Sequence, residues 1–235
     1  MYIFNHSHEK LQPKISPWLI YIAYILGFWI ILPFYFGRLI IKGQENIPKN
    51  GSVIVTPSHR SRWDALIIPY AVGRVASGQD LNFMVSSSEM KGIQGWFIRK
   101  LGGFPINSKQ LIGGGLDHSI EILKKEKMLV IFPEGGIFRG SQVRTLKRGT
   151  AHIVIDVKYQ QPSNTVKILP ISIQYSKFFP SWRTKVVVNI GLPMDITIYD
   201  FQDTKNDSER LTYELESHLK RLHTRHNIFE ELNCT

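Results

Sequence analysis

The chain has 235 residues, 43% of them hydrophobic and 11% aromatic, so it can bury a core of its own, and this composition argues against a mostly disordered chain. Lys and Arg outnumber Asp and Glu by 29 to 19, and the net charge of +10 favours contact with phosphate-rich surfaces, either anionic lipid or nucleic acid. The single cysteine, Cys234, excludes an intrachain disulfide and with it a need for an oxidising compartment.

The first predicted element is an apolar segment over residues 18–36, with the sequence WLIYIAYILGFWIILPFYF. It has 19 uncharged residues, close to the roughly 20 that cross a bilayer as a helix, and it contains tryptophans and tyrosines, which favour the headgroup boundary. Gly27 and Pro33 weaken the helical pattern, so the segment is either one spanning helix or two short helices in one leaflet; a buried core helix is a third alternative. We expect residues 1–42 to form a membrane-associated segment whose positive flanks contact anionic lipid.

Short β-branched runs alternate with helical patterns in the rest of the chain. Strands are expected over residues 52–58, 81–87, 104–107, 166–175 and 185–194, with another that starts at 128 and runs into a turn. Helices are expected over residues 62–73, 92–103, 115–127 and 208–227. This alternation predicts an α/β fold, a mixed sheet flanked by helices, in a domain over residues 43–235 that follows the N-terminal membrane-anchoring helical element.

His59 and Asp64 follow the first of these strands, in the stretch SHRSRWD. On an uninterrupted helix, five residues advance about 500°, which would leave the two side chains roughly 140° apart. They meet only if a turn intervenes, and the strand end at Pro57 permits one. Asp64 would then fix the tautomer of His59 and leave its other ring nitrogen as a base. The alternative is a pair of ordinary polar residues beside Arg60, which is expected to be solvated or to face lipid.

Glu134 occupies a similar place in the stretch VIFPEGGIFR. An apolar strand runs into Pro133, and the acid is followed by two glycines. An acid with flexible backbone after a buried strand indicates a site at the carboxyl end of a sheet strand. The alternative is an exposed acid in a surface turn.

Together these stretches resemble the glycerolipid acyltransferase family typified by lysophosphatidic acid acyltransferase. His59 and Asp64 match its first signature, a histidine followed by four residues and an aspartate, and FPEGG at residues 132–136 matches its Phe-Pro-Glu-Gly signature. Three further stretches, GGFPINSK, LKRG and ILPISI, follow the family's order, so that the resemblance covers residues 40–194.

Several positions depart from the family pattern. Ser58 stands where the family has Asn, Gly136 where it has Thr, and Arg139 comes two positions late. Asn107 and Ser108 replace the usual Arg, and the stretch VSSSEM lacks the lysines associated with the acceptor's phosphate. These departures leave the expectation of acyl transfer in place, but they leave the identity of the acceptor open. Replacement charge could come from five residues, Lys109, Arg139, Arg144, Lys147 and Arg148.

The resemblance implies an acyltransferase that moves a fatty acyl group from a thioester to the free hydroxyl of a lysolipid. His59 is the expected base and Asp64 its orienting acid, with substrate-binding roles for Glu134, Gly135, Gly136, Arg139 and Lys147. The backbone N–H groups of the two glycines are candidates for the oxyanion site. The expected reaction converts 1-acyl-glycerol-3-phosphate to phosphatidate, with another lysophospholipid or a glycolipid acceptor as the alternative.

No metal or cofactor is expected; acyl-CoA or acyl carrier protein would carry the donor chain. The expected location is a membrane, integral or monotopic, with the site on the cytoplasmic or another reducing side. The competing classes are a thioester or lysolipid hydrolase, and a non-enzymatic basic protein that binds membranes or nucleic acid. Nucleic acid is not an expected partner, because it would leave the apolar segment unexplained, and the oligomeric state stays open.

Overall fold

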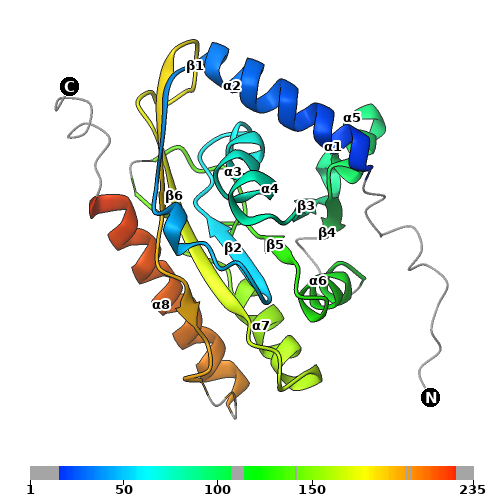
Figure 1. Ribbon diagram of the computed structural model, residues 1–235. Coiled ribbons are helices and arrows are strands. Elements are labelled where there is room, and N and C mark those ends of the chain that lie inside the picture. Colours follow the sequence, from blue (N-terminus) through cyan, green and yellow to red (C-terminus); the bar gives the residue numbers. More distant parts are fainter. Residues whose placement is uncertain (1–15, 107–113, 141, 200, 202, 226–235) are drawn as a thin grey trace.

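The computed structural model describes residues 16–106, 114–140, 142–199, 201 and 203–225 as one mixed sheet with helices on both faces (Figure 1). The elements in chain order are α1 (Pro17–Tyr24), η2 (Ile25–Ile31), α2 (Leu32–Tyr35), β1 (Phe36–Lys42), η3 (Gln44–Asn46), β2 (Val53–Pro57), α3 (Asp64–Val72), α4 (Arg74–Ser77), β3 (Leu81–Ser86), η4 (Ser87–Glu89), α5 (Gly92–Lys100), β4 (Gly103–Ile106), α6 (Gly114–Lys124), β5 (Met128–Val130), α7 (Gly149–Gln160), β6 (Lys167–Tyr175), β7 (Thr184–Ile190), β8 (Met194–Asp195) and α8 (Thr204–Arg225).

The sheet has the strand order β1-β7-β6-β2-β5-β3-β4, and β8 pairs with β6. Four strands, β6, β2, β5 and β3, form a parallel centre, and β4 extends it in parallel; β7 is antiparallel to β6, which makes the sheet mixed as predicted. Val53, Ile54 and Val55 of β2 are all fully buried, as a strand covered on both faces requires.

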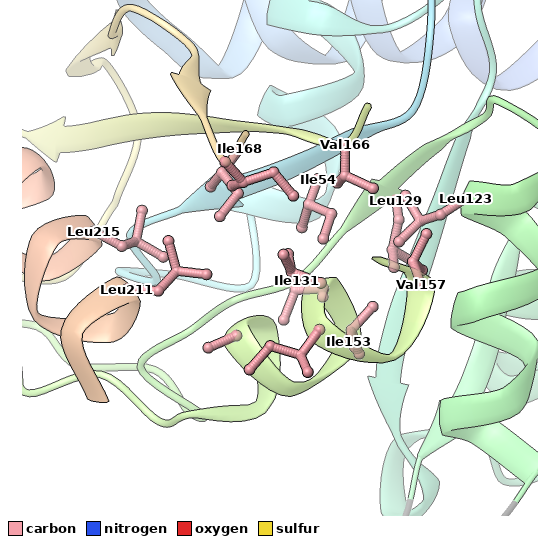
Figure 2. Packing of buried hydrophobic residues seen from close by; sticks show 14 of the residues in the cluster. Ile54, Leu123, Leu129, Ile131, Ile153, Val157, Val166, Ile168, Leu211 and Leu215 are labelled. Atoms are coloured by element: carbon pink, nitrogen blue, oxygen red, sulfur yellow. The ribbon is translucent and has the colours of Figure 1, made fainter. Parts of the chain in front are cut away.

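Two apolar clusters hold the helices against the sheet. In one, α6, α7 and α8 cover the first face, where Leu123, Ile153 and Leu215 meet strand residues such as Ile54 and Ile168 (Figure 2). In the other, α3 and the N-terminal helical stretch cover the second face and contact Val53, Val55 and their neighbours in β6 and β7. The predicted mixed α/β fold with helices on both faces is therefore confirmed.

The N-terminal apolar segment forms one helical stretch, Pro17–Tyr35. The chain remains helical through Gly27, because a π-helical turn over Ile25–Ile31 carries it on to α2, where Pro33 lies in the first turn and needs no N–H donor. The two short helices of that alternative are therefore joined without a break, and the choice between a spanning helix and one that lies in a single leaflet stays a prediction. Within the described residues this is the one helix long and apolar enough to cross a membrane, a test that core helices and signal sequences also pass.

One face of this helix packs on the domain and the other is exposed. Phe28 and Leu32 are buried against the second core cluster, whereas Trp29 is 80% and Phe34 71% exposed. The helix is therefore no enclosed core helix. It leads directly into β1, which pairs in parallel with β7, so the last residues of the predicted 1–42 segment belong to the sheet. The division of the chain at residue 42 stays a prediction.

Candidate active site

The site lies at the carboxyl ends of two neighbouring parallel strands. β2 and β5 pair in register from Val53↔Met128 to Val55↔Val130, so the loops that follow them leave the sheet at the same edge. The first loop carries His59 and the second carries Glu134. The two sequence motifs, 75 residues apart in the chain, are thus brought together by strand pairing.

A tight turn brings His59 and Asp64 into contact. His59 Nδ1 lies 2.9 Å from Asp64 Oδ2, and the same oxygen accepts hydrogen bonds from the backbone N–H groups of Arg60 at 2.7 Å and Ser61 at 2.9 Å. Asp64 begins α3 and its side chain is fully buried, whereas that of His59 is 18% exposed. A carboxylate in this position requires the proton on Nδ1, which leaves Nε2 as the basic nitrogen. The turn expected between the two residues is confirmed.

Tyr175 completes the environment of the Asp64 carboxylate. Its hydroxyl, at the carboxyl end of β6, donates a hydrogen bond of 2.5 Å to Asp64 Oδ1. Burial, followed by the neighbouring Asp64 charge, raises the pKa of the Tyr175 phenol well above its usual value, so the group stays protonated and remains a donor. Sequence analysis did not identify this residue, because only the pairing of β6 with β2 places it here.

Glu134 is buried and anchors the loop that carries His59. Its carboxylate accepts a 3.0 Å hydrogen bond from the backbone N–H of His59, and Arg60 Nη1 donates to both of its oxygens at 3.1 and 3.0 Å. The N–H of Arg144 donates a further bond at 3.0 Å. Both alternatives for these residues are wrong: Glu134 is 4% exposed and is no surface acid, and Arg60 is 5% exposed and is neither solvated nor lipid-facing.

Arg60 also ties down the loop after Glu134. Arg60 Nη1, which contacts the Glu134 carboxylate, also donates to the carbonyl oxygen of Phe138 at 2.7 Å. Arg60 Nη2 donates to the carbonyl oxygen of Gln142 at 3.2 Å. Such additional hydrogen bonds offset part of the cost of burying the pair, and among the described residues Arg60 Nε is the one guanidinium nitrogen that has no partner. The pair therefore fixes the two loops of the site relative to each other.

A cavity of about 650 Å³ opens beside His59. Its lining is mostly apolar and comes from the N-terminal helix, α3, β3, α5 and the loop after β5. The His59 ring stacks on Phe132, with ring centroids 4.0 Å apart, and both residues line the cavity. An imidazole held in one tautomer at the wall of an apolar cavity can act as a general base on a bound hydroxyl.

The residues predicted to bind substrate divide into two groups. Gly135, Gly136 and Lys147 line the same cavity as His59, whereas Glu134 is not part of the lining and its carboxylate is bonded to His59 N–H and to Arg60. Arg139 is not part of this lining, and its guanidinium carbon lies 5.0 Å from the ring centroid of Phe179 instead. Asn107, Ser108 and Lys109 lie outside the described residues, and among the described ones no group of three His, Cys, Asp or Glu side chains could hold a metal.

The two glycines differ as oxyanion donors. Gly135 has φ +72°, and its N–H donates to the carbonyl oxygen of Phe132 at 3.0 Å, so this N–H is already used in the turn. The N–H of Gly136 donates no hydrogen bond within the part of the chain that the structure describes. Of the two candidate donors, Gly136 therefore has the N–H that is not used in the turn, and its role in an oxyanion site stays a prediction.

Comparison with known proteins agrees with this geometry. The family model described as Acyltransferase matches residues 38–174, more than half of the chain and both loops of the site. The chain belongs to the acyltransferase family. A fold match comes from the crystal structure of the 1-acyl-sn-glycerophosphate acyltransferase PlsC of Thermotoga maritima, with a TM-score of 0.62 and 23% identity, covering 92% of this chain and 79% of that one.

Two kinds of curated acyltransferase are similar in sequence. The 1-acyl-sn-glycerol-3-phosphate acyltransferase of Streptococcus pneumoniae is 25% identical over 181 residues, 74% of this chain and 63% of its own length. The mitochondrial glycerol-3-phosphate acyltransferase 1 of Sus scrofa is 27% identical over 188 residues, 72% of this chain. The chain spans only 22% of the length of that relative. These names describe the relatives, and the substrate of this chain is left to be established.

Proposed function

We propose that the protein transfers a fatty acyl chain from a thioester to the free hydroxyl of a lysolipid, with 1-acyl-glycerol-3-phosphate as acceptor and phosphatidate as product. The observation that carries the proposal is the His59–Asp64 contact at the wall of a largely apolar cavity. Family membership and the names of the relatives support it. Acyl-CoA and acyl carrier protein are the candidate carriers of the donor chain.

In the proposed mechanism His59 Nε2 removes the proton from the acceptor hydroxyl as its oxygen attacks the thioester carbonyl. Asp64, held by Tyr175 and two backbone N–H groups, orients the imidazole and stabilises the imidazolium. The negative charge that develops on the carbonyl oxygen meets the N–H of Gly136. When the C–S bond breaks, the imidazolium returns the proton to the thiolate, so no acyl-enzyme forms.

The cavity fits the apolar part of the substrates. Its volume lies in the range of about 300–1,000 Å³ typical of small-molecule sites, and the polar groups that it offers are few. Ile20, Ala23 and Phe28 of the N-terminal helical stretch contribute to its wall. An acyl chain in this cavity would therefore contact the N-terminal helical stretch, which we assign to the membrane surface.

Exposed aromatic residues support a membrane beside the site. Phe34 at the end of the N-terminal helix packs against Trp182 of the β6–β7 connection, with ring centroids 4.5 Å apart. Phe178 and Phe179 in the same connection are 63% and 64% exposed. The connection follows directly after Tyr175, so this aromatic group lies near the catalytic edge. The net charge of +10 favours the anionic cytoplasmic leaflet, and we place the protein there.

The proposal is tested by incubating the purified protein with a labelled acyl thioester and a panel of lysolipids in mixed micelles. The panel contains 1-acyl-glycerol-3-phosphate, other lysophospholipids, monoacylglycerol and a glycolipid acceptor. A labelled diacyl product formed only with an acceptor present supports transfer. Labelled free acid as the sole product indicates a hydrolase, and no turnover of any donor with any acceptor contradicts an enzymatic role. Parallel reactions with acyl-CoA and acyl carrier protein identify the donor.

A further inference from the structure

Helix α5 presents an apolar face to the outside of the molecule. Ile93 is 79% exposed, Trp96 50% and Phe97 45%. These positions are three and four residues apart, so the three side chains share one face of the nine-residue helix. Single exposed apolar residues are ordinary on a protein surface, but a group of them on one helix face marks a surface that contacts something else.

A neighbouring face of the same helix forms part of the catalytic cavity. Gln94 and Ile98 line this cavity together with His59. The helix therefore separates the cavity from whatever the outward face contacts. A substrate chain in the cavity and a partner on the outward face would lie on two sides of one helix.

Helix α5 meets the start of the N-terminal helical stretch (Figure 1). The backbone N–H of Ser16, directly before that stretch, donates to the carbonyl oxygen of Lys100 at 3.1 Å. Trp18 and Tyr21 in the first turns of the stretch are 62% and 58% exposed. Exposed aromatic side chains are therefore present on both helices where the two meet.

The N-terminal helical stretch is attached to the domain along its length. The hydroxyl of Tyr24 accepts a 3.0 Å hydrogen bond from the Arg74 N–H, and the rings of Phe28 and Tyr70 lie 4.9 Å apart. A helix of 19 residues that crossed a bilayer would hold its two ends about 28 Å apart on opposite sides. Because the domain lies beside the start, the middle and the end of this stretch, lipid can cover its outward side only.

Basic residues surround the apolar face of α5. Lys91 precedes the first turn, and Arg99 and Lys100 lie in the last turn, whereas the helix itself contains no acidic residue. Lys100 Nζ lies 5.8 Å from the ring centroid of Trp96. Tryptophan and aliphatic side chains bordered by cations are typical of helices that lie at the surface of an anionic bilayer.

We propose that the outward face of α5, formed by Ile93, Trp96 and Phe97, binds the surface of an anionic lipid bilayer and holds this wall of the cavity against a single leaflet. A lipid surface fits better than a second copy of the chain, because two α5 faces packed together would bring the cations of both copies close to one another. The consequence for catalysis rests on the proposed acyl transfer: an acceptor embedded in a bilayer needs α5, whereas one dissolved in water does not.

The first test compares Ile93→Ser with wild type in co-sedimentation with vesicles that contain phosphatidylglycerol and phosphatidylcholine. Ile93 does not line the cavity, and its replacement is expected to weaken binding about tenfold. Ile198→Ser is the matched control, since Ile198 is 68% exposed and follows β8, which pairs with the first residues of β6 at the opposite edge of the sheet from His59. Equal binding of the two variants overturns the proposal.

A second arm tests the charge of the partner and the alternative occupant. The double variant Lys91→Gln with Arg99→Gln should bind anionic vesicles about fivefold more weakly for each charge removed and should bind pure phosphatidylcholine vesicles as wild type does. Unchanged binding to anionic vesicles contradicts the proposal. A wild-type dimer in lipid-free solution that Ile93→Ser dissociates would assign the face to a second copy and also overturn it.

A third arm separates failure of this surface from failure of the proposed acyl transfer. For a long-chain lysolipid held in vesicles, Ile93→Ser should raise the apparent KM about tenfold, in line with its weaker vesicle binding. Transfer to a short-chain acceptor below its critical micelle concentration should be unchanged, and equal losses with both acceptors overturn the proposal. Vesicle binding requires no turnover, so its loss in Ile93→Ser supports the surface even if no acyl transfer is found.

Discussion

Replacement of Glu134 by Gln is expected to destabilise the whole site. The carboxylate accepts hydrogen bonds from the backbone N–H groups of His59 and Arg144 and, on both of its oxygens, from Arg60 Nη1. Glu134→Gln preserves size and removes the charge, so that the Arg60 cation, 5% exposed, is left in the interior without a counter-ion.

The magnitude follows from the burial of the pair. Breaking a buried ion pair by removing one partner costs about 3–5 kcal/mol of unfolding free energy. In a chain of this size each kcal/mol shifts the melting temperature by about 2–4 °C, so we expect a decrease of about 6–20 °C. The matched control is Glu121→Gln, which disrupts the exposed i,i+3 pair with Lys124 and should cost less than about 0.5 kcal/mol.

Thermal unfolding followed by circular dichroism gives the melting temperatures of both variants. Acyl-transfer assays at a temperature where both are folded show how each substitution changes the activity that we assign to His59. A double variant, Arg60→Met with Glu134→Leu, should melt above Glu134→Gln, because no buried charge remains unpaired. If Glu134→Gln melts within the range of the control, or if the double variant is the less stable one, the account of the buried pair is refuted.

Three further variants test separate parts of the site. Tyr175→Phe removes one donor from the carboxylate that orients the imidazole, so kcat should fall while KM stays as in wild type. An unchanged kcat would contradict a positioning role for Tyr175. Gly135→Ala should abolish most activity and lower the melting temperature, because φ at this position is +72° and the new Cβ would meet the Lys147 side chain. Gly136→Ala has open space around its Cβ and should fold and melt as wild type. Equal melting temperatures for the two variants would disprove the steric argument. Trp182→Ser should weaken co-sedimentation with anionic vesicles relative to Tyr213→Ser, a control exposed on α8, and equal binding would place the membrane elsewhere.

The sequence predicts much of the fold because its apolar pattern is local. The β-branched runs that form β2 and β6 are bounded by Pro, Gly and polar residues, and their burial on both faces is visible as continuous hydrophobicity. The turn between His59 and Asp64 is also predictable, since a strand ends at Pro57 and a helix starts a few residues later. The contact between His59 and Asp64 could therefore be proposed from the sequence, whereas their catalytic role depended on the resemblance of several stretches to the acyltransferase family.

Contacts between distant segments could not be predicted in the same way. Arg60 looks like a solvated arginine until the pairing of β2 with β5 brings Glu134 beside it. Tyr175 lies 111 residues from Asp64 and ends an ordinary apolar strand. His223 on the last helix is buried, and its Nδ1 lies 2.9 Å from the Ser172 hydroxyl. A single sequence contains no signal for such partners, since each depends on strand order and helix docking.

The most direct test of the account is the rate of acyl transfer by His59→Ala, measured with purified protein whose melting temperature matches that of wild type. Because a positioned base contributes about 10²–10⁴-fold, we expect kcat to fall by that factor while the donor still binds. A His59→Ala variant that transfers the acyl chain to the lysolipid at the wild-type rate would show that another group accepts the proton.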